Sequence, residues 1–102
     1  METNEYYVGT DLKFKLNLVA AGFSMERDNF KIEVYCNAKK ISYTKDDLVE
    51  GEDGWYLAVD TDGFPPGTVW MVATAYVPDS DMPDGIRKEV TVCNLCTIKK
   101  TR

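Results

Sequence analysis

The sequence predicts an all-β fold, a single antiparallel β-sandwich, Ig-like or jelly-roll-like, with six to seven strands. Three observations favour it. Apolar and polar residues alternate with period two along several segments. Turn-forming residues recur about every ten residues, and no long amphipathic helical pattern occurs. A small barrel is the alternative that the pattern leaves open. We expect residues 1–102 to form one domain with frayed ends at 1–4 and 99–102.

The first part of the chain alternates in short segments. The expected strands are residues 11–19, 30–36 and 39–44, with 6–8 as a candidate additional strand. Ser24 is placed to cap a single helical turn between the first two main strands. Asn37 and Ala38 are expected to form a tight turn between the second and the third.

Residues 44–60 are expected to form a capped helical turn, a polar turn and another strand. Thr44 and Asp47 have the spacing of a capping box, so we expect one short helical turn with Leu48 in the core. Residues 50–54 are expected to form a polar turn before a strand that starts at Gly54. The proline- and glycine-rich residues 61–67 cannot lie inside a central strand.

Residues 68–77 form the most informative strand, because both of its faces are apolar. We expect one face to be the sandwich interior: Val69, Met71, Ala73, Ala75 and Val77. The opposite face carries Trp70, Val72 and Tyr76. Such a strand is either covered on both sides or exposes an adhesive face.

The last strand, residues 86–98, changes its alternation. Val90 and Val92 share one parity, whereas Cys93 and Leu95 hold the other, which predicts a β-bulge near residues 92–94.

The CNLC stretch, residues 93–96, has the spacing of a redox or zinc motif. A regular strand, however, points positions i and i+3 to opposite faces, roughly 10 Å apart, too far for a disulfide. A structural zinc ion needs four ligands, and Cys36 is the only other cysteine. We therefore interpret the cysteines as small buried apolar side chains.

The acidic loop within residues 76–90 offers calcium candidates in Asp79, Asp81 and Asp84. Its third aspartate, Asp84, and the following glycine are one position late for the EF-hand spacing, and the position of the bidentate glutamate is occupied by Val90. Pro-Asp-Gly is in contrast a turn signature. We interpret the segment as a long hairpin connection, with no metal and no cofactor.

Several function classes are disfavoured by composition. The net charge of -5 disfavours nucleic-acid binding. The chain has no histidine, which excludes Ser-His-Asp and Cys-His catalysis, and no phosphate-binding glycine motif is found, so we expect no enzyme. No apolar run is long enough for a membrane span. The first ten residues lack the apolar region of a signal peptide, which favours a cytoplasmic location.

The aromatic residues are the remaining lead. Trp55, Tyr56, Trp70 and Tyr76 are expected on neighbouring strands, with Trp55 in the core and Trp70 on the surface. We assign partner binding to Trp70, Val72, Tyr76 and Tyr56. The alternative is a carbohydrate-binding module in which Trp70, Tyr76 and Tyr56 stack on sugar rings.

Three stretches occur in a suggestive order: V-G-T-D-L-K-F, then G-W-Y-L-A-V-D-T, then P-P-G-T-V-W-M-V-A-T-A-Y-V-P-D-S-D-M-P-D-G-I-R-K-E-V. This order resembles small Ig-like β-sandwich proteins of gut-bacterial phages and prophages. It is also similar in outline to the N-terminal domains of phage baseplate upper proteins. The resemblance implies a virion component whose role is assembly, and it brings no catalytic or binding residue with it. We expect a structural or adaptor module that associates with a protein partner or with itself.

Overall fold

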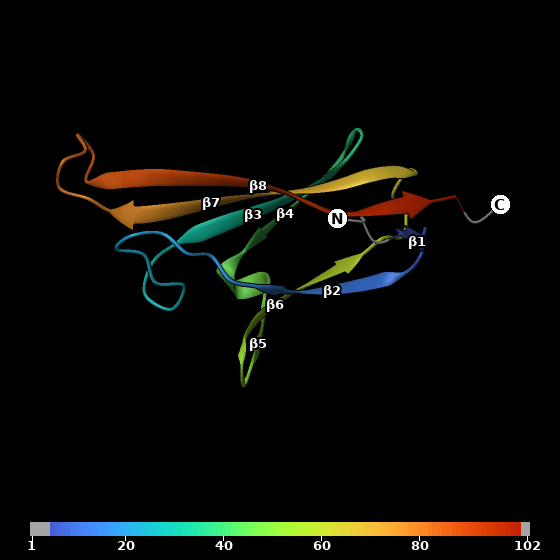
Figure 1. Cartoon of the computed structure of the whole chain (residues 1–102), viewed down its shortest axis with the longest axis horizontal. Helices are drawn as coiled ribbons and strands as arrows, with labels where there is room; N and C mark the ends of the chain where they lie inside the picture. The colour runs from blue at the N-terminus through green and yellow to red at the C-terminus, as the bar shows by residue number, and fades with distance from the viewer. Residues whose placement is uncertain (1–4, 101–102) are drawn as a thin grey trace.

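The computed structural model describes residues 5–100 and contains two packed β-sheets (Figure 1). The larger sheet has the strand order β1-β8-β7-β3-β4, and the smaller has the order β2-β6-β5. The strands are β1 (Glu5–Tyr7), β2 (Asp11–Leu16), β3 (Phe30–Cys36), β4 (Lys39–Thr44), β5 (Val49–Gly51), β6 (Gly54–Asp60), β7 (Gly67–Pro78) and β8 (Ile86–Lys99). The all-β sandwich predicted from the sequence is confirmed.

Several details differ from the prediction. The strand expected over residues 11–19 ends at Leu16, and Val19 is exposed. The described residues form eight strands, because β5 occupies part of the expected polar turn at 50–54. β1 runs parallel to β8, so the larger sheet is mixed. Lys99 is not frayed, since it pairs with Tyr7 and its ammonium lies 2.9 Å from the Glu5 carboxylate. The predicted fraying of 1–4 and 101–102 lies outside the described residues.

The interior follows the predicted alternation. All five residues predicted for the inner face of β7 are buried: Val69, Met71, Ala73, Ala75 and Val77. Ile32 and Leu57 are completely inaccessible and come from opposite sheets. Because buried apolar side chains of both sheets form one cluster, hydrophobic burial holds the layers together.

The predicted capping box is present at the start of the 3-10 turn η1 (Lys45–Asp47). The backbone N–H of Thr44 donates to the Asp47 carboxylate over 2.8 Å, and the Thr44 hydroxyl donates to the same oxygen over 3.2 Å. The turn delivers Leu48 into the core, as predicted.

The predicted bulge in the last strand lies at Leu95, one position beyond the expected window. Val69 of β7 faces Cys96, whereas Trp70 faces Asn94, so Leu95 is the extra residue. This bulge corrects two cysteine predictions. Cys93 and Cys96 lie on the same face, because the extra residue reverses the parity, and Cys93 is exposed rather than buried.

Candidate interaction surface

The outer face of the larger sheet carries the side chains assigned to partner binding on β7. Trp70, Val72 and Tyr76 alternate with the buried inner residues, and Trp70 is 43% exposed. Tyr56 does not join them. It lies on β6 in the smaller sheet, where its hydroxyl donates to Asp53 over 2.8 Å. The expectation that these aromatic residues share neighbouring strands is therefore wrong.

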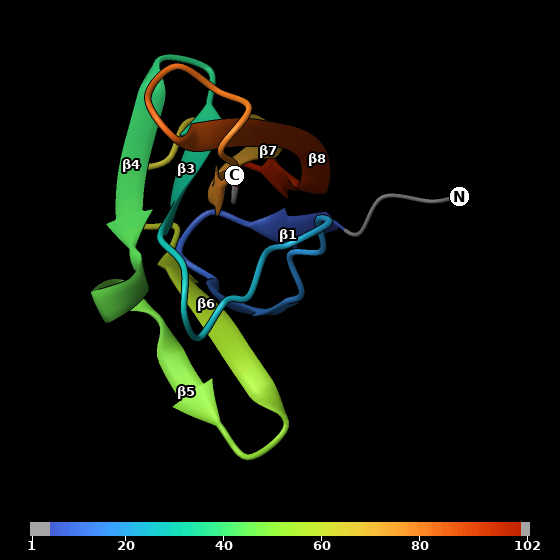
Figure 2. The same cartoon turned by 90° about the vertical axis from the view of Figure 1, so that its left-hand side faces the viewer.

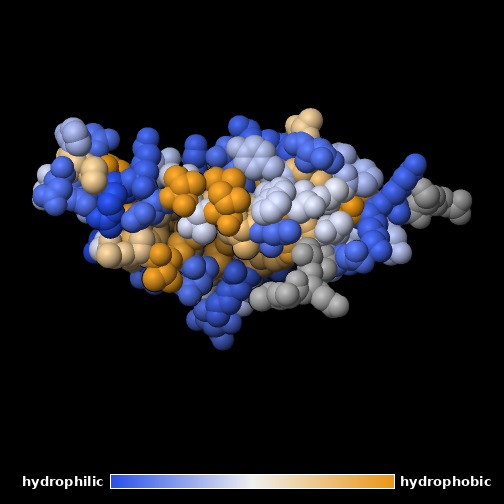
Figure 3. Space-filling model, turned by 45° about the horizontal axis from the view of Figure 1, so that its top comes forward, coloured by the Kyte–Doolittle hydropathy of each residue, from blue (hydrophilic) through white to orange (hydrophobic). Residues whose placement is uncertain are grey.

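Two valines of β8 extend this surface. Val92 lies directly opposite Val72, and Val90 lies opposite Thr74. They are 62% and 61% exposed, which is unusual for β-branched residues in the middle of a strand. We define the outer patch as Trp70, Val72, Tyr76, Val90 and Val92. In Figure 3 hydrophobic atoms gather in the middle of the face above the larger sheet.

The outer patch is bordered on one side by polar residues of β3 and β4. Glu33 lies opposite Val72 and accepts a hydrogen bond from the Tyr35 hydroxyl over 3.2 Å. Its carboxylate also lies 3.4 Å from the Lys40 ammonium and 3.9 Å from that of Lys31. The apolar surface is thus confined to β7 and β8.

The other border of the outer patch is an open sheet edge. β1 pairs with β8 only along Thr97–Lys99, so among residues 5–100 no strand pairs with the outer edge of β8 from Ile86 to Cys96. Every residue from Lys88 to Asn94 is exposed. Figure 2 shows β8 and β4 at opposite sides of the larger sheet.

The other edges carry the protection that natural sheets commonly use. β4 begins with Lys39 and Lys40, and β2 contains Lys13 and Lys15. β1 and β5 are only three residues long. The edge of β8 is long and carries two exposed valines, so it differs from all the others in the described part of the chain.

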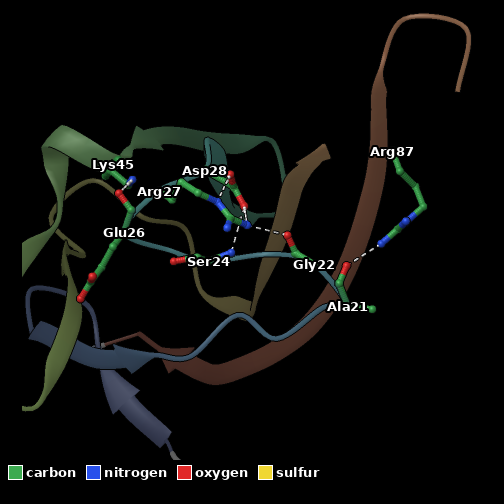
Figure 4. Close-up of polar contacts among 8 residues, drawn as sticks. All are labelled: Ala21, Gly22, Ser24, Glu26, Arg27, Asp28, Lys45 and Arg87. Carbon is green, nitrogen blue, oxygen red and sulfur yellow. Dashed lines mark hydrogen bonds and ion pairs between the residues drawn. The ribbon is translucent and has the colours of Figure 1, made fainter. Parts of the chain in front are cut away.

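The start of this edge is anchored by Arg87. Its guanidinium forms an ion pair with Asp79 and contacts the Glu89 carboxylate over 3.2 Å. It also donates to the Ala21 carbonyl over 2.7 Å (Figure 4). The hairpin of β7 and β8 is therefore tied to the loop between β2 and β3. The contacts of Arg87 fix the direction in which β8 leaves the acidic loop.

That same β2–β3 loop is closed by its own ion pair. Arg27 contacts the Asp28 carboxylate over 2.9 Å and donates to the Gly22 carbonyl over 2.7 Å. Asp28 also accepts from the Ser24 backbone N–H over 3.0 Å, and Lys45 donates to the Glu26 carbonyl over 2.9 Å (Figure 4). These contacts close the loop on itself and connect it to Lys45 of η1. The predicted turn at Ser24 is present. The Asp28 backbone N–H donates to the Ser24 carbonyl over 2.8 Å, and the Asp28 carboxylate caps the turn by accepting from the Ser24 backbone N–H.

The calcium candidates are engaged in the hairpin connection. Asp79 accepts from the Asp81 backbone N–H over 2.9 Å, and Asp84 accepts from the Ile86 backbone N–H over 3.1 Å. Gly85 has a φ of 76°, as the turn interpretation requires. No cluster of three metal-ligating side chains is found within the described residues. The hydrogen bonds fit a turn in which the Asp79 and Asp84 carboxylates accept from backbone N–H groups, whereas Asp81 contributes its backbone N–H.

Sequence reasoning missed Val90 and Val92 as surface residues, because it did not give the register of the β7–β8 hairpin. The hairpin places Pro78 opposite Ile86. Six residues before Pro78 on β7 is Val72, and six residues after Ile86 on β8 is Val92, so the two valines lie opposite each other. The turn alone therefore sets which side chains share the outer face.

Comparison of the chain with family models, curated proteins and solved structures finds no match. Within residues 5–100 there is no helix of the length and apolarity needed to cross a membrane.

Proposed function

We propose that this chain is a non-enzymatic structural or adaptor module that acts by protein–protein association through the outer patch. The observation that carries the proposal is the contiguous exposure of Trp70, Val90 and Val92 beside an open strand edge. Exposed apolar patches of this kind usually mark interaction sites, and tryptophan is enriched where binding energy concentrates. Self-association is one form of this function.

We also propose a phage or prophage origin, with folding in the cytoplasm before assembly into a virion. The resemblance noted in the sequence supports this, since its quoted stretches fall on β2, β6, β7 and β8. An Ig-like class is supported by the strand order. β2-β6-β5 facing β8-β7-β3-β4 corresponds to strands B-E-D facing G-F-C-C′ of immunoglobulin sandwiches. Capsid, portal or tail genes beside this gene are the expected observation, and their absence would contradict the origin.

The association is tested by replacing the two outer aromatic residues separately. We expect Trp70→Ala and Tyr76→Glu to lower the mass measured by light scattering at high protein concentration, because each removes apolar contact area from the outer patch. Tyr56→Ala is the matched control, since Tyr56 lies on the other sheet. A wild-type chain that stays monomeric at high concentration would contradict self-association.

A carbohydrate-binding module remains the second candidate, because one aromatic pair lies on the outer face. Trp70 lies directly opposite Tyr35 of β3, which gives two neighbouring rings for sugar stacking. The expected result is a saturable change in tryptophan fluorescence on glycan titration that is lost in Trp70→Ala. A signal that persists in Trp70→Ala would have to come from Trp55 and would contradict this platform.

A further inference from the structure

The open edge of β8 has unused backbone hydrogen-bonding groups, and the ladder identifies them. The backbone N–H of Tyr76 donates to the Asn29 carbonyl over 3.0 Å, so Tyr76 directs its main-chain groups toward β3. On the hairpin side, the N–H of Asp79 donates to the Gly85 carbonyl over 2.9 Å. In an antiparallel ladder alternate residues bond to the same neighbour. Tyr76, Thr74 and Val72 therefore bond to β3.

The partners of those residues on β8 must then face outward. Lys88 lies opposite Tyr76, Val90 opposite Thr74 and Val92 opposite Val72. Their N–H and C=O groups point to the side of β8 where the described chain places no strand. The residues between them bond to β7. The edge thus offers a regular row of donors and acceptors beside two exposed valines.

We propose that this edge pairs with the same edge of a second copy of the chain, antiparallel about a two-fold axis at Thr91. The larger sheets of the two copies then form one continuous sheet. This inference deepens the proposed function by naming the partner and the contact. A two-fold axis perpendicular to a sheet keeps each outer face on the same side, so the outer patches of the two copies become adjacent.

The extent of the edge favours the axis at Thr91. The free part of β8 begins at Ile86, where the strand starts, and ends at Cys96, because β1 occupies the edge from Thr97. Thr91 is the midpoint of that stretch. Pairing about Thr91 matches four outward-facing residues with one another, because Lys88 then meets Asn94 and Val90 meets Val92 on both sides of the axis.

Side-chain chemistry favours the same register. Val90 of one copy lies opposite Val92 of the other, and this contact occurs twice because of the symmetry. Lys88 faces Asn94 and Glu89 faces Cys93, so no like charges lie directly opposite. Moving the axis to Glu89 or Lys88 would bring two identical charges face to face. Moving it to Val90 or Val92 would leave only one valine pair.

Backbone pairing is tested by two replacements at one position, measured by light scattering or sedimentation over a concentration series. Val90→Pro removes an N–H that the folded chain does not use, and proline is tolerated where that group faces solvent at an edge. Val90→Ala retains the N–H and removes only side-chain contact. We expect Val90→Pro to weaken dimerisation at least about tenfold more than Val90→Ala, because the symmetry removes one backbone hydrogen bond from each copy, with unchanged circular dichroism.

The register is tested by disulfide trapping in a Cys93→Ser background. Thr91→Cys places two thiols opposite each other across the axis in a non-hydrogen-bonded pair, a geometry within disulfide reach. Lys88→Cys, on the same edge, faces Asn94 of the other copy and serves as the control. Faster oxidation to covalent dimer at Thr91→Cys supports the register, whereas faster oxidation at Lys88→Cys overturns it.

The two proposals fail in different ways. If Val90→Pro associates like Val90→Ala while Trp70→Ala lowers the mass, edge pairing is overturned and association through the outer patch stands. If Val90→Pro is monomeric and Trp70→Ala is unaffected, edge pairing stands and the outer aromatic contact is overturned. A wild-type monomer at every concentration overturns pairing with a second copy.

Discussion

At the scale of single residues, the three thiols experience two different environments. Cys36 and Cys96 lie on the inner face on either side of Val69 and are completely buried. Burial raises the pKa of Cys96 to about 11, with a smaller contribution from Cys36, and burial also raises the pKa of Cys36. Cys93 is exposed on the open edge. The pair of buried thiols therefore contributes packing, and their thiolate forms are scarce at neutral pH.

This difference is measurable by thiol titration with an aromatic disulfide reagent. At low protein concentration we expect rapid labelling of Cys93 alone, because it is exposed whereas Cys36 and Cys96 are buried. Cys36 and Cys96 should react after denaturation. Labelling that persists in the folded Cys93→Ser variant at the rate of wild type would contradict the assignment.

Asp28 gives a prediction about pH. Its side chain is almost buried, and the hydrogen bond from Arg27, followed by that from the Ser24 backbone, lowers its pKa below the ordinary value. A carboxyl whose pKa is lower in the folded state stabilises the fold above its unfolded pKa, about 3.9, and loses that contribution below it. We expect the melting temperature of wild type to exceed that of Asp28→Asn at neutral pH, and the difference to shrink as the pH falls below about 4.

The exposed Asp46 supplies the control for this measurement. It lies in η1 and has no hydrogen bond or ion pair among the described residues, so Asp46→Asn should change the melting temperature little at any pH. A wild-type advantage over Asp28→Asn that is constant down to about pH 2 would contradict the role of the carboxylate charge.

At the scale of elements, the contribution of the capping box to stability can be tested directly, because a neighbouring aspartate serves as the control. Asp47 accepts the Thr44 backbone N–H, whereas the neighbouring Asp46 accepts none. We expect Asp47→Ala to reduce the free energy of unfolding by about 1 kcal/mol, the usual contribution of a cap. Asp46→Ala should stay within about 0.5 kcal/mol of wild type. Urea unfolding of both variants measures the difference, and equal midpoints would show that the cap contributes nothing.

The elements also show what could be predicted from the sequence. Strict alternation predicted the inner face of β7, and the Thr44 spacing predicted η1, because both depend on neighbours along the chain. The parallel pairing of β1 with β8 and the separation of Tyr56 from Trp70 depend on how the chain crosses between sheets, which period-two patterns do not encode. β5 was missed because three residues cannot display an alternation.

The bulge illustrates how one residue changes a site. The parity switch near Cys93 was visible in the sequence, and it predicted a bulge. Its position at Leu95 decides that Cys93 and Cys96 share a face, a consequence that a regular strand would forbid. An extra residue anywhere between Cys93 and Cys96 has this effect, because every side chain beyond it changes face.

At the scale of the whole molecule, the unequal sheets explain the open surface. The smaller sheet has three strands and the larger has five, so the inner face of β8 is only partly covered. A pocket of about 220 Å³ lies there, lined by residues that include Ala73, Ala75, Glu89 and Thr91. The middle of β8 is consequently exposed on both faces and along its edge. A neighbouring strand that pairs with the free backbone N–H and C=O groups would stabilise β8 more than any other strand of the molecule.

The net charge decides how such a dimer responds to salt. Each chain carries a formal charge of -5, so two copies repel one another at long range. The contact proposed at Thr91 consists of backbone hydrogen bonds and valines, with no charge pair across the axis that salt would weaken. Because screening shortens the range of repulsion to about 10 Å at 0.1 M ionic strength and less above it, we expect the dissociation constant to fall as sodium chloride is raised. Sedimentation equilibrium at several salt concentrations measures this, with Val90→Pro as the monomeric control. A dissociation constant that rises with salt would instead indicate an interface held by ion pairs and would contradict pairing through the edge of β8.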